Sequence, residues 1–141
     1  MADRPESLDP ATLTSLQPGL ARLMPEIAAR MWKAFYAAQG GNWDLSRWQL
    51  KEMQKLFRLG NITRPKYAAD VESYLVDDIA PLMEAVDEHD FAKFQSLHKE
   101  AVDAANEFHR RWQKPWIMWQ LPATPPLDLV LQPTIEPKEQ A

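Results

Sequence analysis

Histidine is the residue type in this chain that is best suited to acid–base or ligand chemistry. His98 and His109 both lie in the segment 90–114, eleven residues apart. An imidazole titrates near neutral pH, donates or accepts a hydrogen bond, and ligates metals. The sequence around His109 reads DAANEFHRRW, with the small Ala105 four residues before the histidine and the bulky Phe108 directly before it. His109 is therefore one candidate functional residue; the alternative is a structural histidine that interacts with the dipole of a helix C-terminus.

Composition excludes several other chemistries. The 141 residues include no cysteine, which excludes disulfides, thiolate metal sites, cysteine nucleophiles and covalently attached haem. The residues three positions before the three histidines are Val86, Gln95 and Asn106, so the Glu-x-x-His pattern of di-iron bundles is missing. Glycine-rich phosphate loops and the nucleophile motif Gly-x-Ser-x-Gly are missing too. The net charge of −4 gives no reason to expect nucleic acid as a partner. We predict neither catalytic residues nor a metal site.

Six tryptophans are the most unusual compositional feature. Their large rings would anchor a core and a tail, and this is the simplest interpretation. The functional alternative is an aromatic-lined pocket beside small inward residues, suited to a small apolar or aromatic molecule. The predicted ligand-binding residues are Trp32, Phe35, Trp48, Tyr74, His98, Ala101, Ala105, Phe108, His109 and Trp112.

Three further polar residues lie on or near the predicted apolar faces. His98 occupies a core-facing position, where a buried histidine bonded to a carbonyl or a carboxylate is the simplest interpretation and a ligand-orienting role is the alternative. Asp78 and Glu52 lie near the inward stripes of their helices, and each is expected at the edge of its stripe. A buried carboxylate would need a partner such as His98 or Arg30.

Apolar spacing predicts four long helices. The first covers 20–39, where the residues Gly40 and Gly41 end it, and the second covers about 45–59, with Gly60 after it. The third opens near Pro65 and continues past a kink at Pro81 to residue 86. In the fourth, positions 91, 94, 98, 101, 105, 108 and 112 show an unbroken 3-4 spacing after a capping Asp90. A short additional helix is predicted to start at Pro10, capped by Asp9.

Together these helices predict an all-α fold, an antiparallel up-down-up-down four-helix bundle with an extended proline-rich C-terminal tail. We divide the chain into a proline-containing segment 1–19, a bundle 20–114 and a tail 115–141 packed on the bundle, with 136–141 frayed. No run of about 18 apolar residues is present, so we expect no membrane span. The first 19 residues do not read as a signal peptide, which favours a cytoplasmic location; a periplasmic one would follow if a leader precedes this sequence.

Three phrases of the chain resemble a branch of the class II c-type cytochromes, the cytochrome c′-like four-helix bundles. AFYAAQGGNWDLSRWQLKEM is similar to the junction of the first two helices, and PATPPLDLVLQP is similar to the tail. AANEFHRRW resembles the haem-attachment motif C-x-x-C-H in position and spacing, with Ala105 and Phe108 in place of the two thiols. The resemblance covers roughly residues 20–133.

The resemblance implies a bundle shaped around a haem that this chain is unable to hold covalently. His109 would correspond to the axial haem ligand. We therefore expect a haem-free member that binds a small apolar or aromatic molecule without covalent bonds and without catalysis, oriented by His98 or His109. One alternative is a structural or interaction module, a homodimer or accessory subunit with a filled core, which an exposed Trp32 or Met31 would support. A further alternative is a b-type haem on His109, for which Phe108 and Trp112 leave little room.

Overall fold

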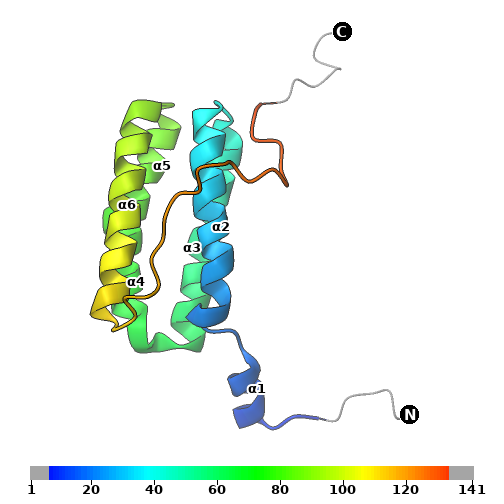
Figure 1. The fold of residues 1–141 in the computed structure, drawn as a ribbon. Coiled ribbons are helices and arrows are strands. Elements are labelled where there is room, and N and C mark those ends of the chain that lie inside the picture. Colours follow the sequence, from blue (N-terminus) through cyan, green and yellow to red (C-terminus); the bar gives the residue numbers. More distant parts are fainter. Residues whose placement is uncertain (1–6, 134–141) are drawn as a thin grey trace.

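A computed structural model describes residues 7–133, which are all-helical apart from loops and the tail and contain no strand. The predicted all-α bundle is therefore confirmed. The long helical segments lie side by side, and a short helix projects beyond one end of the bundle (Figure 1). The elements are α1 (Pro10–Leu16), α2 (Leu20–Gln39), α3 (Trp43–Thr63), η1 (Pro65–Tyr67), α4 (Ala68–Tyr74), η2 (Leu75–Ile79), α5 (Ala80–Asp87) and α6 (Phe91–Arg111).

Side-chain caps start three of the helices, and two of these caps, Asp9 and Asp90, are the predicted ones. Asp9 accepts a hydrogen bond from the Thr12 N–H at 2.7 Å and starts α1. Asn42 Oδ1 accepts from the Leu45 N–H at 3.2 Å and starts α3. Asp90 accepts from the Lys93 N–H at 3.0 Å and starts α6. Each cap pairs an amide that has no partner within its own helix.

The second helix differs from its prediction at Trp48, whereas Met53 and Phe57 of its apolar face are buried. Trp48, expected inside, is 49 % exposed, whereas its neighbours Gln49 and Leu50 are buried. Two polar groups tolerate burial here because both are paired. The Ser46 hydroxyl donates to the Ala34 carbonyl at 2.8 Å, and Gln49 Oε1 accepts from Arg30 at 2.9 Å. An apolar pattern alone assigns such polar residues to the outside.

Gly60 was predicted to follow the second helix, but it lies inside α3, which continues to Thr63. Gly60 is buried against α2. A Cβ atom at this position would lie 2.7 Å from Leu20 Cδ2. The glycine therefore permits a close approach of two helices, which outweighs its low helix propensity.

The third helical segment is continuous around Pro81, but its hydrogen-bond pattern changes. A 3₁₀ turn, η1, precedes α4, and the π turn η2 connects α4 to α5. In this π turn the Ala80 N–H donates to the Leu75 carbonyl, five residues earlier. Proline lacks an N–H and crowds the preceding turn, so a wider turn directly before Pro81 lets the helix continue. The buried residues of this segment are Val71, Tyr74, Leu75, Ile79, Leu82, Ala85 and Val86.

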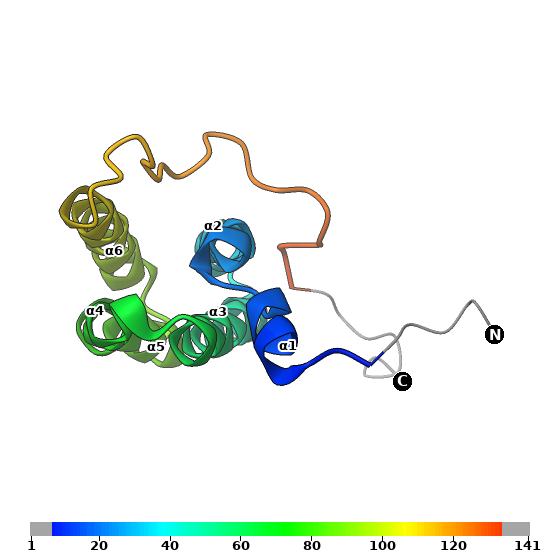
Figure 2. The same ribbon diagram turned by 90° about the horizontal axis from the view of Figure 1, so that it is seen from below.

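The tail covers the side of the bundle formed by α2 and α6 (Figures 1 and 2). Residues 114–133 contain no helix. Trp119 and Leu131 are buried there, whereas Leu127 and Val130 are 82 % and 66 % exposed. The proposed frayed segment 136–141 lies outside the described residues, as do 134, 135 and residues 1–6.

The fourth helix matches its prediction most closely. All seven positions of the 3-4 pattern are buried or half-buried, and the chain leaves the helix after Arg111. Asn106 and His109 are buried as well, although neither belongs to that pattern. Both side chains contact the tail. The tail therefore creates a second buried face on α6.

Candidate functional site

A half-open hollow lies where α4, the C-terminal end of α6 and the tail meet. It includes about 300 Å³ of empty space, part of it open to solvent, and the volume open to the centre of a water molecule is about 20 Å³. That smaller volume holds one or two waters. The lining residues are Met24, Phe57, Asp70, Val71, Tyr74, Ala105, Phe108, His109, Trp112 and Trp119.

Aromatic rings form a connected series along the lining. The centroid distances are 5.8 Å from Phe57 to Tyr74, 6.0 Å from Tyr74 to Phe108 and 5.8 Å from Phe108 to Trp112. The first two pairs meet edge to face, which is a favoured arrangement for aromatic rings. Tyr67 supports this series from outside by stacking on Trp112 at 4.1 Å. The rings hold one another in place, so the hollow has apolar and preformed walls.

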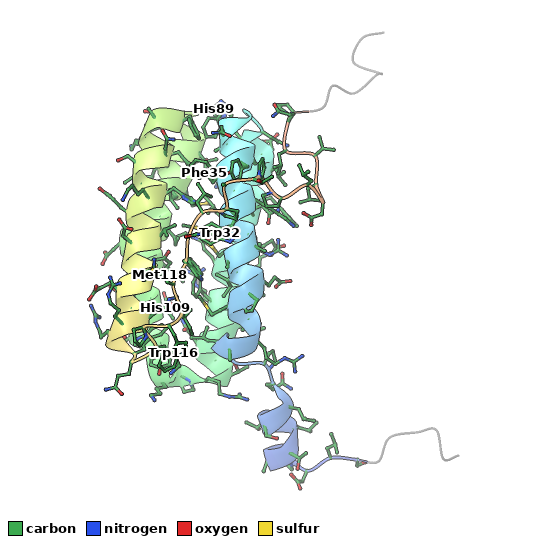
Figure 3. The ribbon with its side chains drawn as sticks, in the orientation of Figure 1. Trp32, Phe35, His89, His109, Trp116 and Met118 are labelled. Atoms are coloured by element: carbon green, nitrogen blue, oxygen red, sulfur yellow. The ribbon has the colours of Figure 1, made fainter. Side chains whose placement is uncertain are left out.

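His109 lies near the C-terminal end of α6, beside the tail (Figure 3). Its ring centroid is 6.2 Å from that of Trp112 and 6.0 Å from that of Trp119. Nδ1 lies 3.1 Å from the Ile117 carbonyl oxygen. Burial lowers the pKa of His109, and the hydrogen bond to Ile117 opposes this effect in part. Because a carbonyl only accepts, the Nδ1 atom carries the hydrogen.

The polar groups of the α4 wall are paired within the protein. The Trp112 indole N–H donates to Asp70 Oδ2 at 2.8 Å, and Arg111 lies 3.6 Å from Oδ1 of the same carboxylate. The Tyr74 hydroxyl donates to the Ala101 carbonyl at 2.8 Å. These bonds position the rings of Trp112 and Tyr74 and leave the surface of the hollow mostly apolar.

The tail supplies one wall through Trp119. Asn106 holds the main chain of this residue at both atoms: its Nδ2 donates to the Trp119 carbonyl at 2.9 Å, and its Oδ1 accepts from the Trp119 N–H at 2.6 Å. The Trp119 ring also meets Trp32 edge to face at 5.4 Å. Further along the tail, the Tyr36 hydroxyl donates to the Pro122 carbonyl. The tail is thus a fixed part of the hollow.

Five of the ten predicted ligand-binding residues line the hollow together: Tyr74, Ala105, Phe108, His109 and Trp112. They come from two helices that are distant in sequence. Ala105 is 6 % exposed and belongs to the lining, so the small residue does leave room beside the histidine.

Three other predicted residues form a separate, filled cluster in the core. His98 is 2 % exposed, its ring lies 4.9 Å from Phe35 and 6.2 Å from Trp32, and its Nε2 lies 3.0 Å from the Met31 carbonyl oxygen. Burial lowers the pKa of His98 from 6.5 to about 4. His98 is therefore a neutral core histidine bonded to a carbonyl, as its simplest interpretation expected.

Ala101 and Trp48 do not line the hollow either. Ala101 is fully buried and offers its carbonyl to Tyr74. Trp48 lies on the outer face of α3, where the Arg30 guanidinium carbon is 5.1 Å from its ring centroid. The prediction that Trp48 belongs to the site is therefore wrong.

Asp78 and Glu52 are both partly exposed, as residues at the edge of a stripe. Partial burial, followed by the neighbouring Asp77 and Glu100 charges, raises the pKa of Asp78 from 3.8 to about 6. Glu52 lies 3.3 Å from Lys55. Neither carboxylate belongs to the hollow.

Comparisons of the chain with family models, with curated proteins and with solved structures returned no match. Within residues 7–133, no group of three or more His, Asp or Glu side chains is placed to hold a metal ion. Over the same residues, no helix has both the length and the apolar character needed to cross a membrane.

Sequence reasoning missed five lining residues: Met24, Phe57, Asp70, Val71 and Trp119. Phe57 and Val71 belong to the apolar spacing of their helices, and such spacing does not distinguish a core wall from a pocket wall. Trp119 had a weak signal, because a tryptophan between prolines in a tail needs a place to pack. No sequence signal indicates that Asp70 would pair with an indole forty-two residues away.

Proposed function

We propose that this protein binds a small, largely apolar or aromatic molecule, without covalent bonds and without catalysis, in the hollow beside Ala105 and His109. One observation carries the proposal: Ala105 and a connected series of aromatic rings line a half-open apolar space that the tail closes with Trp119. Binding sites for small molecules are concave and mostly apolar, with few polar groups. The antiparallel up-down-up-down order and the likeness to cytochrome c′ bundles belong to this proposal as well.

A porphyrin does not fit this hollow as it stands. The positions corresponding to the two thiols of the resembling motif are Ala105 and Phe108, and the Phe108 and Trp112 rings occupy the wall. The space open to a water centre, about 20 Å³, is far smaller than a macrocycle needs. A ligand about the size of one aromatic ring would therefore occupy the solvent-open part of the hollow as well as the enclosed part, and a b-type haem on His109 has less support.

The experiment is a titration of the full chain with toluene, followed by amide and methyl NMR shifts. We expect saturable shifts of Ala105, Val71 and Met24. Replacing Ala105→Trp fills the hollow and should abolish these shifts. The matched control is Ala92→Trp, on the exposed face of the same helix, which should leave binding unchanged. Unchanged toluene binding in Ala105→Trp would refute this placement of the site.

The second candidate is an interaction module. Trp116 and Met118 are 76 % and 65 % exposed on the tail, which favours contact with another protein there. Dimerisation through α2 has less support, because Met31 is fully buried and Trp32 packs against Trp119. Sedimentation at increasing protein concentration tests homodimerisation, with Trp116→Ser as the variant expected to weaken it. A monomer at all concentrations would count against a homodimer.

A further inference from the structure

The hydrogen on the His109 ring has a definite place. Nδ1 lies 3.1 Å from the Ile117 carbonyl oxygen, which accepts and does not donate, so Nδ1 is the protonated nitrogen. Burial lowers the pKa of His109, which keeps the ring neutral at pH 7. In this tautomer Nε2 has a lone pair. No described residue donates a hydrogen bond to Nε2.

The other helix-borne polar groups of the lining have no free hydrogen to offer. The Tyr74 hydroxyl donates to Ala101, and the Trp112 indole N–H donates to Asp70, both at 2.8 Å. The remaining donor is the Trp119 indole N–H, on the tail side, which has no acceptor among the described residues. The helical side of the hollow therefore offers ring surfaces and two acceptors: His109 Nε2, which has no partner among the described residues, and the Asp70 carboxylate, whose two oxygens already face Trp112 and Arg111.

We propose that the hollow selects small single-ring aromatic molecules that carry a hydrogen-bond donor, with phenol as the simplest example, and that His109 Nε2 accepts that donor. The inference rests on the proposed function and names its ligand class. The series of rings would contact the ligand ring, and the Ile117 carbonyl fixes the imidazole in the accepting tautomer. A ligand without a donor leaves Nε2 buried and unpaired, which is costly.

Three probes of similar size test this selectivity in the full chain: phenol, which donates; anisole, which only accepts; and toluene, which does neither. We expect phenol to bind at least about tenfold more tightly than toluene and anisole, as estimated from the cost of one unpaired buried polar group. The ¹⁵N resonance of His109 Nε2 should shift with phenol and stay in place with toluene. This readout needs no variant and so does not depend on a mutant that folds.

His109→Phe supplies the matched variant, because it keeps a ring and removes the acceptor. It should reduce phenol binding to the level of toluene binding while toluene binding persists. Equal binding of phenol and toluene by the wild type, with an unmoved Nε2 resonance, would overturn the inference and leave the proposed function intact. Preference for anisole would assign the polar contact to Trp119 and overturn it as well. Failure of all three probes to bind would overturn both proposals.

Discussion

The Asn106 carboxamide pairs with both main-chain atoms of Trp119, at 2.9 Å and 2.6 Å. This double hydrogen bond attaches the tail to α6 at the point where it closes the hollow. It also explains why an asparagine is 8 % exposed on a helix face outside the apolar pattern. Each end of the side chain satisfies a main-chain group that would otherwise be buried and unpaired.

Asn106→Ala should therefore destabilise the protein by about 2–4 kcal/mol, since it leaves a buried N–H and a buried carbonyl without partners. Urea unfolding followed by tryptophan fluorescence measures this change, and limited proteolysis should cut near Trp119 more rapidly. Gln95→Ala, at an exposed position of the same helix, is the control and should change little. If Asn106→Ala lowered the free energy of unfolding no more than Gln95→Ala does, the contact between Asn106 and the tail would contribute no stability.

The inward face of α3 can be checked by two substitutions two positions apart. Leu50 is fully buried, so Leu50→Ala should cost about 2–5 kcal/mol. Trp48 is 49 % exposed, so Trp48→Gln should cost less than about 1 kcal/mol, although it removes the larger side chain and the Arg30 contact. Chemical denaturation measures both values. The reverse order of the two losses would place Trp48 inside the bundle.

His98 and Asp78 should respond to acid in opposite directions. The pKa of His98 falls from 6.5 to about 4 on folding. Its contribution to the free energy of unfolding is therefore complete above pH 6.5 and decreases by about 3 kcal/mol as the pH falls toward 4. The pKa of Asp78 rises from 3.8 to about 6 on folding, so its contribution to the free energy of unfolding is complete below pH 3.8 and is lost as the pH increases through 6. As the pH falls, the loss from His98 and the gain from Asp78 therefore offset each other in part.

Asp78→Asn removes the titrating carboxyl group that opposes the effect of His98. We expect this variant to be more stable than the wild type at pH 7 and to lose stability more steeply between pH 6.5 and 4. Urea midpoints at several pH values provide the measurement, with Asp103→Asn on the exposed face of α6 as the control. Parallel stability curves for Asp78→Asn and the wild type would contradict the assignment.

The Lys33–Asp128 pair attaches the distal part of the tail to α2, with 2.6 Å between Nζ and Oδ2. Asp128 is 66 % exposed, so solvent and salt screen this attraction. Asp128→Asn should lower the urea midpoint less than Asn106→Ala does, and the difference from the wild type should vanish at high salt. A decrease of the urea midpoint that did not depend on salt would mean that Asp128 stabilises the protein by an interaction other than its charge.

The sequence by itself determined the helices, because local rules govern them. Asp9, Asn42 and Asp90 pair the first free amides, and the 3-4 spacing of the last helix places one face inward whatever lies opposite. Ala105 and His109 also share a helix, so their presence together in one site followed from their spacing.

Only the tertiary structure decided which polar residues are buried and where the hollow lies. Ser46 and Gln49 are buried in α3 because Ala34 and Arg30 provide partners from another helix. Trp119 reaches the hollow only because the tail folds back along α6. The carbonyl of Ile117, eight residues later and beyond the end of the helix, decides which ring nitrogen of His109 is the acceptor. Such partners are distant in sequence or lie in irregular backbone, so no local periodicity encodes them.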